Sequence, residues 1–296
     1  MIEAAKHYLE LRPVGVRSRF QVYKAYLQTL VARFLRKREF VTVGQFLSKD
    51  SLVRYRGLVL YARSQSEDIG YYARRTKPWT SEWFKPQRGD VVVDCGSSVG
   101  IFTLVALQVG AVVYAFEANP ATFQILRRNI ELNGLGDVAH TYNTALSDKV
   151  GSATLYAADH FTGTSSLSRD WAKEYLRVDD KITALQTPVT TLDDALDELK
   201  RVDWLLIDVE GHEDALLRGA SSLLERTERI IIEVSHKNSK EVREQLLRHG
   251  FSESARGTPE STLRYYLFSR EPSGPDRAAA GPVLSVRPSR SEVGDL

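Results

Sequence analysis

From residue 90 to residue 270 the chain alternates short apolar runs with longer amphipathic stretches. The apolar runs are rich in residues that favour strands and lie at 91–95, 111–117, 138–146, 204–210 and 229–235. After four of these five runs, apolar residues recur every three or four positions, which predicts helices at 99–110, 120–133, 212–224 and 238–249. Apolar strands alternating with helices are typical of a parallel sheet covered on both faces. We therefore expect one α/β domain over residues 86–270.

The pattern changes once inside this domain and again at its end. Residues 151–188 interrupt the alternation, and a connection of that length usually covers a site or is disordered. Residues 251–255 and 261–269 alternate apolar and polar positions, which predicts an antiparallel pair that closes the sheet. The tail at 271–296 is rich in Pro, Gly, Ser and charge, so we expect it to be disordered.

Residues 1–85 predict a basic extension with helical and β-hairpin parts. They hold 17 Lys/Arg and 7 Asp/Glu, whereas the rest of the chain holds 23 and 31. Residues 52–63 alternate around Gly57, which predicts a small β-hairpin. The preceding stretch predicts a helix with one apolar face, made of Phe20, Tyr23, Leu27, Leu30 and Phe34. We expect that face to dock on the rest of the protein, leaving a solvated basic rim; a membrane-surface helix is the alternative. For the basic extension as a whole, the partners that fit its charge are phosphates, an anionic membrane, an acidic partner or the acidic body of the same chain.

The composition agrees with an ordinary globular protein of 296 residues, 43% hydrophobic and 26% charged. No apolar run approaches the roughly 20 residues needed to span a bilayer. The first residues carry acid and lack the apolar region of a signal peptide. The single cysteine, Cys95, excludes an internal disulfide and a cysteine-based zinc cluster. These features predict a cytoplasmic protein.

The ends of the first two strands carry residues suited to a nucleoside. Ligands of open α/β sheets bind beyond the carboxyl ends of the strands. The first strand runs into the turn DCGSSVG, where Gly96 allows close backbone approach and the next helix offers free N–H groups. The spacing differs from that of the dinucleotide motif G-x-G-x-x-G. Glu117 ends the second strand about twenty residues later, where an acid can accept hydrogen bonds from both hydroxyls of a ribose.

Acids also end the later strands. Asp208 and Glu210 should share a face, because side chains alternate along a strand. Glu233 ends the next strand, and His236 follows it. Such groups can act as general bases, as ligands of a divalent metal such as Mg²⁺, or as anchors for sugar hydroxyls. Acids there can also simply complement the dipole of the next helix, so the sequence leaves their roles open.

Four blocks of sequence, taken in order, resemble one known family. They read VVVDCGSSVGIFTL, YAFEANPATFQILRRNIELNG, NTALSDKVGSATLY with GTSSL, and TLDDAL followed by VDWLLIDVEGHEDALLRGA. The chain resembles the FkbM-type methyltransferases, a class I family that uses S-adenosylmethionine. The resemblance spans residues 90–235 and implies a Rossmann-like class I methyltransferase sheet.

The resemblance also implies cofactor-binding roles. Glu117 would hold the ribose, the methionine part would lie among Asp94, Gly96, Ser98 and Gly100, and the adenine would lie near Leu146 and Ser147. Two positions depart from the family's usual pattern. Ser98 stands where Asn is common, although Ser can still donate a hydrogen bond. Leu206 stands where a Lys often precedes the I-D-V-E-G run.

We therefore expect O-methylation of a hydroxyl on a sugar, a lipid or a small metabolite. The candidate catalytic residues are Asp208, Glu210, Glu233 and His236, with Asp208 or His236 as the base. One alternative is an RNA methyltransferase that grips phosphates with its basic extension, although the sequence has no recognisable RNA-binding module. The other is an inactive nucleoside-binding module, which Leu206 suggests. Peripheral membrane contact is compatible with the basic extension, and nothing in the sequence indicates an oligomeric state.

Overall fold

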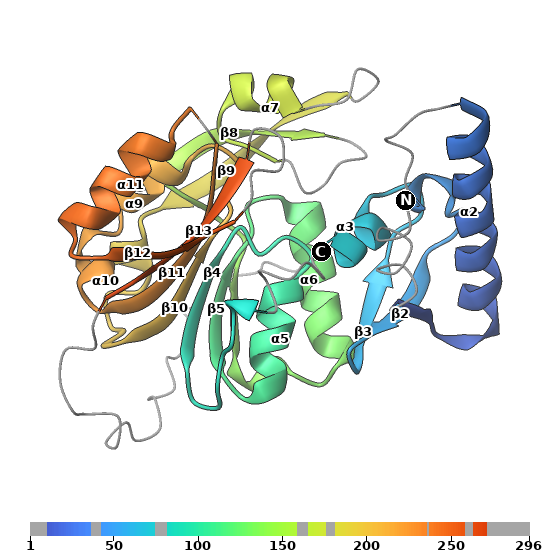
Figure 1. Ribbon diagram of the computed structural model, residues 1–296, viewed down its shortest axis with the longest axis horizontal. Helices are drawn as coiled ribbons and strands as arrows, with labels where there is room; N and C mark the ends of the chain where they lie inside the picture. Colours follow the sequence, from blue (N-terminus) through green and yellow to red (C-terminus); the bar gives the residue numbers. More distant parts are fainter. Residues whose placement is uncertain are drawn as a thin grey trace, which may run out of the picture.

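The computed structural model describes residues 11–36, 43–74, 82–158, 165–175, 181–235, 237–257 and 263–270. Two sequence predictions lie outside these residues: the disorder of the tail at 271–296 and the role of His236. The described chain has a central sheet with helices on both faces, a smaller sheet above one edge, and an N-terminal extension at one side (Figure 1).

The central sheet has seven strands in the order β12-β13-β11-β10-β4-β5-β6. The neighbours from β11 to β6 pair in parallel; these strands are β4 (Val91–Cys95), β5 (Val112–Phe116), β6 (Ala139–Tyr142), β10 (Val202–Ile207) and β11 (Thr227–Ser235). The closing strand β13 (Leu263–Ser269) pairs antiparallel with both β11 and β12 (Ser252–Arg256). The predicted sheet, including its antiparallel pair, is confirmed.

Helices divide the core into two clusters, one on each face of the sheet. On one face lie α5 (Ile101–Val109) and α6 (Pro120–Leu132). The other face is covered by α8 (Leu192–Ala195), α9 (Glu213–Arg218), α10 (Ser221–Glu225) and α11 (Ser239–Arg248). Alternate residues of β4 show the division, because Val92 packs with α5 whereas Val91 and Val93 pack in the opposite cluster.

Two predicted elements are wrong as single elements. The strand predicted at 138–146 is preceded by a 3₁₀ turn, η2 (Gly136–Val138), and ends at Tyr142; the next strand, β7 (Ala145–Leu146), pairs with β9 in another sheet. The helix predicted at 212–224 is divided into α9 and α10 near Gly219. Gly219 lets the chain of the neighbouring loop approach, since an added Cβ would lie 2.1 Å from the carbonyl oxygen of Ser147.

The interruption at 151–188 contains regular structure in its described parts. The strands β8 (Gly151–Ala158) and β9 (Ile182–Thr190) pair antiparallel, and with β7 they form a three-stranded sheet in the order β7-β9-β8. The helix α7 (Arg169–Tyr175) follows β8. The sequence left open whether this segment covers a site or is disordered, and the regular structure of its described parts agrees with the first.

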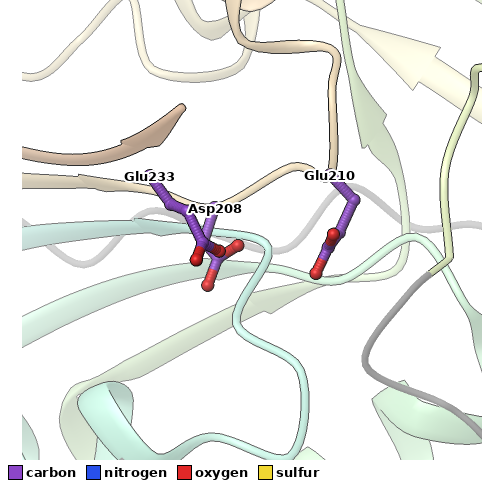
Figure 2. A group of neighbouring side chains, drawn as sticks. All are labelled: Asp208, Glu210 and Glu233. Atoms are coloured by element: carbon purple, nitrogen blue, oxygen red, sulfur yellow. The ribbon is translucent and has the colours of Figure 1, made fainter. Parts of the chain in front are cut away.

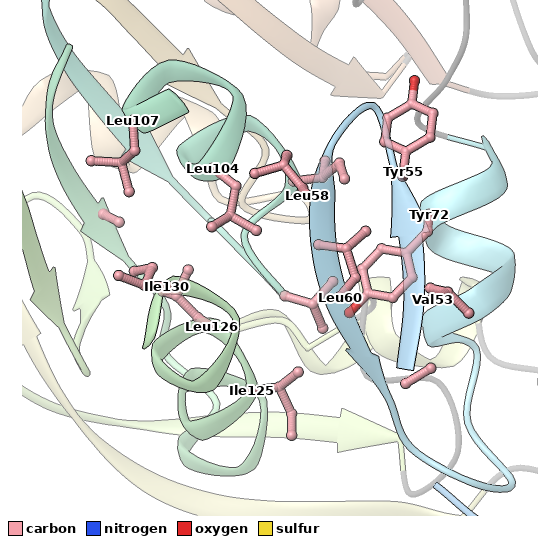
Figure 3. Close-up of a cluster of buried hydrophobic side chains, with 14 of the residues drawn as sticks. Val53, Tyr55, Leu58, Leu60, Tyr72, Leu104, Leu107, Ile125, Leu126 and Ile130 are labelled. Atoms are coloured by element: carbon pink, nitrogen blue, oxygen red, sulfur yellow. The ribbon is translucent and has the colours of Figure 1, made fainter. Parts of the chain in front are cut away.

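The N-terminal extension shares the core of the main domain. Its elements are β1 (Arg12–Pro13), α2 (Gly15–Arg36), η1 (Gly44–Phe46), β2 (Ser51–Tyr55), β3 (Leu58–Ala62) and α3 (Asp68–Arg74). The hairpin predicted around Gly57 is confirmed. Figure 3 shows Leu58 and Leu60 facing Leu104 and Leu126, and all four belong to one buried cluster.

Polar contacts fix the outer edge of β3 to α6. The side-chain oxygen of Asn129 accepts from the N–H of Tyr61 at 2.7 Å. Asn133 accepts from the N–H of Val59 at 2.8 Å and donates to its carbonyl oxygen at 2.7 Å. The hydroxyl of Tyr72 donates to the carbonyl oxygen of Tyr61 at 2.6 Å. Two amide side chains thus take the place of a neighbouring strand along this edge.

The helix α2 is confirmed, but the face predicted to dock is wrong. The buried side chains are small or medium in size and lie at Ser18, Val22, Ala25 and Thr29. They let the helix lie close to the hairpin, where the hydroxyl of Ser18 accepts from the N–H of Leu52 at 3.1 Å. The exposed side chains are the large apolar ones, Phe20, Tyr23, Leu27 and Leu30. The side chain of Phe34 lies outside the described part, and no described helix is long and apolar enough to cross a membrane.

Candidate functional site

A pocket lies where the chain order of the central sheet reverses. The adjacent strands β4 and β10 continue in opposite directions, to β5 on one side and β11 on the other. Ligands of open α/β sheets bind at such a point. The pocket has about 610 Å³ of empty volume, part of it open to solvent. Its lining brings together residues that follow three strands, Gly96 and Ser98 after β4, Glu117 after β5, and Asp208 and Glu210 after β10.

Gly96 is required at the floor of this pocket for two reasons. Its φ of +82° lies in the left-handed region, which side chains with a Cβ disfavour. An added Cβ would also lie 1.9 Å from the carbonyl oxygen of Asp208. The N–H of Asp208 donates to the carbonyl oxygen of Cys95 at 2.9 Å. The chain segments after β4 and β10 are therefore in direct contact through their backbones.

Backbone N–H groups orient the carboxylate of Glu117. The N–H of Ser98 donates to Oε2 at 2.9 Å, and the N–H of Asn119 donates to Oε1 at 2.7 Å. An ionised carboxylate has about four acceptor positions, so each oxygen retains one for a further donor. Burial raises the pKa of Glu117 to about 7, and the nearby carboxylate of Asp94 acts in the same direction. The two backbone N–H groups oppose this rise.

The other predicted cofactor residues around β4 take different places. Ser98 lines the pocket and has a φ of 52°, an uncommon conformation for a residue with a side chain. Asp94 is buried behind the pocket, where it accepts from the hydroxyl of Thr103 at 2.6 Å. Gly100 begins α5 and packs against α6, since an added Cβ would lie 2.5 Å from Cδ1 of Leu126. Asp94 and Gly100 therefore shape the turn around the pocket.

Three predicted catalytic carboxylates converge at the ends of β10 and β11. One oxygen each from Asp208, Glu210 and Glu233 lies within 4.8 Å of the others. Figure 2 shows the side chains of Asp208 and Glu233 next to each other, with that of Glu210 approaching from the following loop. Carboxylates at this spacing repel one another when ionised, so the cluster favours a metal ion or the cationic part of a ligand. His236 lies outside the described residues.

The helix α7 and the loop before it hold the loop that carries Glu210. The hydroxyl of Ser166 donates to the carbonyl oxygen of Glu210 at 2.6 Å, and Nε1 of Trp171 donates to its Oε2 at 3.1 Å. Gly211 lies against the indole ring, where an added Cβ would lie 2.4 Å from Cε3 of Trp171. Glu210 has a φ of 52°, so these contacts stabilise a strained backbone beside the pocket.

The predicted adenine side lies between β7 and α9. Leu146 lines the pocket, together with Ala145 and Thr144. Ser147 is buried, and its hydroxyl lies 2.9 Å from Nε2 of His212, which also lines the pocket. Burial lowers the pKa of His212, which favours its neutral form.

Sequence reasoning missed several residues that line this pocket. Tyr71 comes from α3 of the N-terminal extension, and Ser165 and Leu167 come from the loop before α7. None of them follows a strand of the central sheet, which was the signal that identified the other candidates. The GTSSL block of the resemblance contained Ser165 and Leu167 but gave no role for them.

Comparison with known families agrees with this geometry. The family model described as the methyltransferase FkbM domain matches residues 94–253. That match runs from the end of β4 to β12 and includes the described residues after β4, β5, β10 and β11.

Individual relatives match over part of their length. The chain is 33% identical over 144 residues to methyltransferase 1 of Beauveria bassiana, covering 43% of this chain and 57% of the relative. It is 28% identical over 153 residues to methyltransferase sdnD of Sordaria araneosa, covering 43% of this chain and 59% of the relative. Among solved structures, magnesium protoporphyrin IX methyltransferase from Synechocystis has 17% identity and a TM-score of 0.38, with 62% of this chain and 71% of that chain covered. Trm5b from Pyrococcus abyssi has 14% identity and a TM-score of 0.43, with 75% and 56% covered.

Proposed function

The chain belongs to the methyltransferase FkbM domain family, and on that premise we propose that it transfers a methyl group from S-adenosylmethionine to a hydroxyl oxygen. The observation that carries the proposal is the oriented carboxylate of Glu117 at the end of β5. Its two oxygens are held by backbone N–H groups and line the pocket. The two hydroxyls of a ribose are donors that fit the acceptor positions left on this carboxylate.

The rest of the pocket suits the other parts of the cofactor. The apolar side chains of Leu146, Phe116 and Leu155 line it and offer contacts for a flat base. The carboxylates of Asp208, Glu210 and Glu233 create a negative environment, which favours a positively charged sulfonium over a neutral ligand. Glu117, Asp208 and Glu210 line one pocket, and Glu233 lies beside the two acids after β10. This placement supports binding of the methyl donor with its charged end toward β10 and β11.

The residues at the end of β10 then act on the acceptor. S-adenosylmethionine supplies a methyl group bonded to positively charged sulfur; as the acceptor oxygen bonds to the methyl carbon, the carbon–sulfur bond breaks and its electrons stay on sulfur. Asp208 takes the proton of the acceptor hydroxyl, while Glu210 and Glu233 orient that hydroxyl. Alignment of two reactants can supply roughly 7–11 kcal/mol of a barrier. A positioned base contributes about 10²–10⁴-fold in rate. The acceptor class we propose is a sugar, a lipid or a small metabolite.

Asp208→Asn tests the proposed base. It should leave the affinity for S-adenosylmethionine within a few-fold and lower turnover by roughly 10²-fold or more. Binding is measured by calorimetry, and turnover by transfer of a radiolabelled methyl group to a panel of sugar, lipid and small-metabolite acceptors. Glu131→Gln is the matched control, because that side chain is 69% exposed on α6, and it should change neither quantity.

The remaining outcomes assign other functions. Turnover that is lost with a chelator and restored by Mg²⁺ would make Asp208 a metal ligand, with the base elsewhere. Full turnover of Asp208→Asn would refute its role as base. Cofactor binding with no transfer to any acceptor would identify a nucleoside-binding module that lacks activity. Transfer to RNA with a steep salt dependence would refute the proposed acceptor class.

A further inference from the structure

The outer face of α2 carries a continuous row of exposed apolar side chains. The exposed fractions are 84% for Val16, 66% for Phe20, 62% for Tyr23, 63% for Leu27, 49% for Leu30 and 47% for Val31. These six side chains are defined here as the α2 stripe. Only four other large hydrophobic side chains are exposed in the rest of the described chain, and they are scattered over separate elements. Isolated exposed apolar residues are ordinary, but a contiguous row indicates a contact surface.

The described part of the fold does not bury this stripe. Each residue of an α-helix turns about 100°, so Ser18, Val22, Ala25 and Thr29 lie on one side and the stripe lies on the opposite side. The first group is buried against the hairpin, as described above. The outer side of α2 faces away from the rest of the molecule (Figure 1). From Val16 to Val31 the stripe extends about 22 Å along the helix axis, at 1.5 Å per residue.

Positive charges border the stripe on both sides. On the same helical projection, Arg19 lies along one border and Arg17 and Lys24 lie along the other, and all three side chains are exposed. Over its whole length the sequence of α2 has five Lys/Arg and no Asp/Glu. An apolar face bordered by cations on a helix of low net hydrophobicity is typical of helices that lie in the interface of a membrane.

We propose that α2 binds the surface of an anionic membrane, with its axis parallel to the surface and the α2 stripe inserted among the lipids. The cations along the borders would then reach the phosphate level, while the stems of Lys24 and the arginines lie along the apolar boundary. Pairing of two copies through the same face is less favourable, because it would bring together cationic borders from helices that contain no acid. This inference does not depend on the proposed methyl transfer, since its test measures binding alone.

The test uses the full chain with two kinds of vesicle, phosphatidylcholine alone and phosphatidylcholine mixed with phosphatidylserine. We expect the protein to co-sediment with the anionic vesicles, and this binding should weaken at high salt and on neutral vesicles. The double variant Phe20→Ser and Leu27→Ser should bind at least tenfold more weakly. Its melting temperature should not fall, because both side chains are exposed in the folded protein.

A matched control removes apolar surface elsewhere. Leu247 on α11 is 51% exposed and Leu132 on α6 is 38% exposed, and replacing both by Ser should leave vesicle binding unchanged. Lys24→Glu should weaken binding to anionic vesicles without affecting the melting temperature. Equal binding of the stripe variant and the wild-type protein would overturn the proposal. The proposal would also be overturned if the wild-type protein does not bind vesicles and light scattering shows it as a dimer that the stripe variant does not form. That result would assign this face to a second copy of the chain.

Discussion

Glu117 should make cofactor binding depend on pH near neutrality. In the ligand-free protein, burial raises the pKa of this carboxyl from 4.5 to about 7. Two ribose hydroxyls that donate to the carboxylate stabilise its ionised form, so the pKa falls in the complex. Binding therefore releases a proton at pH values near and below 7, and affinity rises with pH through that range.

The size of the effect follows from the ionised fraction of Glu117. With a pKa of about 7, the ionised fraction is about one eleventh at pH 6 and about ten elevenths at pH 8. If only the ionised form binds, the affinity for S-adenosylmethionine should be about tenfold lower at pH 6 than at pH 8. That ratio corresponds to about 1.4 kcal/mol.

Calorimetry at several pH values, in buffers with different enthalpies of ionisation, measures both the affinity and the proton release. The Glu117→Gln variant should bind S-adenosylmethionine more weakly at pH 8. The proton that Glu117 releases on binding in the wild-type protein should no longer be released. Protons released by the ligand itself are the same for both proteins, so they cancel when the two proteins are compared. An affinity that does not change between pH 6 and 8, or an equal pH dependence in Glu117→Gln, would refute the assigned ribose contact.

The same raised pKa has the opposite effect on the stability of the ligand-free protein. Burial also raises the pKa of Glu213 to about 7, although this residue does not line the pocket. The folded state then holds protons more tightly than the unfolded state between about pH 4.5 and 7, so the free energy of unfolding falls as pH rises through this window. Glu213→Gln should reduce that fall but leave the pH dependence of cofactor binding intact, which makes it the control for Glu117.

Two further predictions concern the backbone and the core. Gly96→Ala should lower both cofactor affinity and stability, because it adds strain at a positive φ and a clash with Asp208. Gly250→Ala, with a φ of +79° and open space around it, should lower stability by only about 1–2 kcal/mol and leave cofactor binding unchanged. If calorimetry and thermal melts show equal losses of affinity and stability for the two variants, the predicted clash at Gly96 is contradicted. Leu60→Ala should lower the free energy of unfolding by about 2–5 kcal/mol in a single transition, because Leu60 is fully buried in the shared core. Val59→Ala should lower it by less. A separate early transition in denaturant would show that the N-terminal extension unfolds on its own.

The central sheet was predictable because burial on both faces leaves a direct trace in the sequence. Every residue of β4 and β10 is buried, so each strand appears as a nearly continuous apolar run with a single aspartate. The smaller sheet left a weaker trace. Most of β9 is exposed or half-buried, and its polar residues Thr183, Gln186 and Thr187 hide the strand pattern. Its partner β8 begins with exposed positions as well, so neither strand has a long apolar signal.

Some residues of the candidate site could likewise be predicted from the sequence, and others could not. Gly96, Glu117 and Asp208 could be brought together from sequence because parallel strands present their carboxyl ends at one edge of a sheet. The position of Tyr71 could not, because it depends on how the extension packs on α6 through side-chain amides. The support of Glu210 by Trp171 depends on a contact between segments 39 residues apart, for which no periodicity gives a signal.

The face of α2 shows what periodicity leaves undetermined. The recurrence of Phe20 and Leu27 correctly predicted which residues share a side of the helix, but it could not decide what that side contacts. The opposite side carries Ser18 and Ala25, whose small side chains allow the helix backbone to approach the hairpin closely. Packing of one protein segment against another depends more on complementary shape than on a large apolar area. A large apolar side opposite a small-residue side therefore indicates two contacts for one helix. The protein occupies the small side, and the cations that border the large side favour an anionic lipid surface as its second partner.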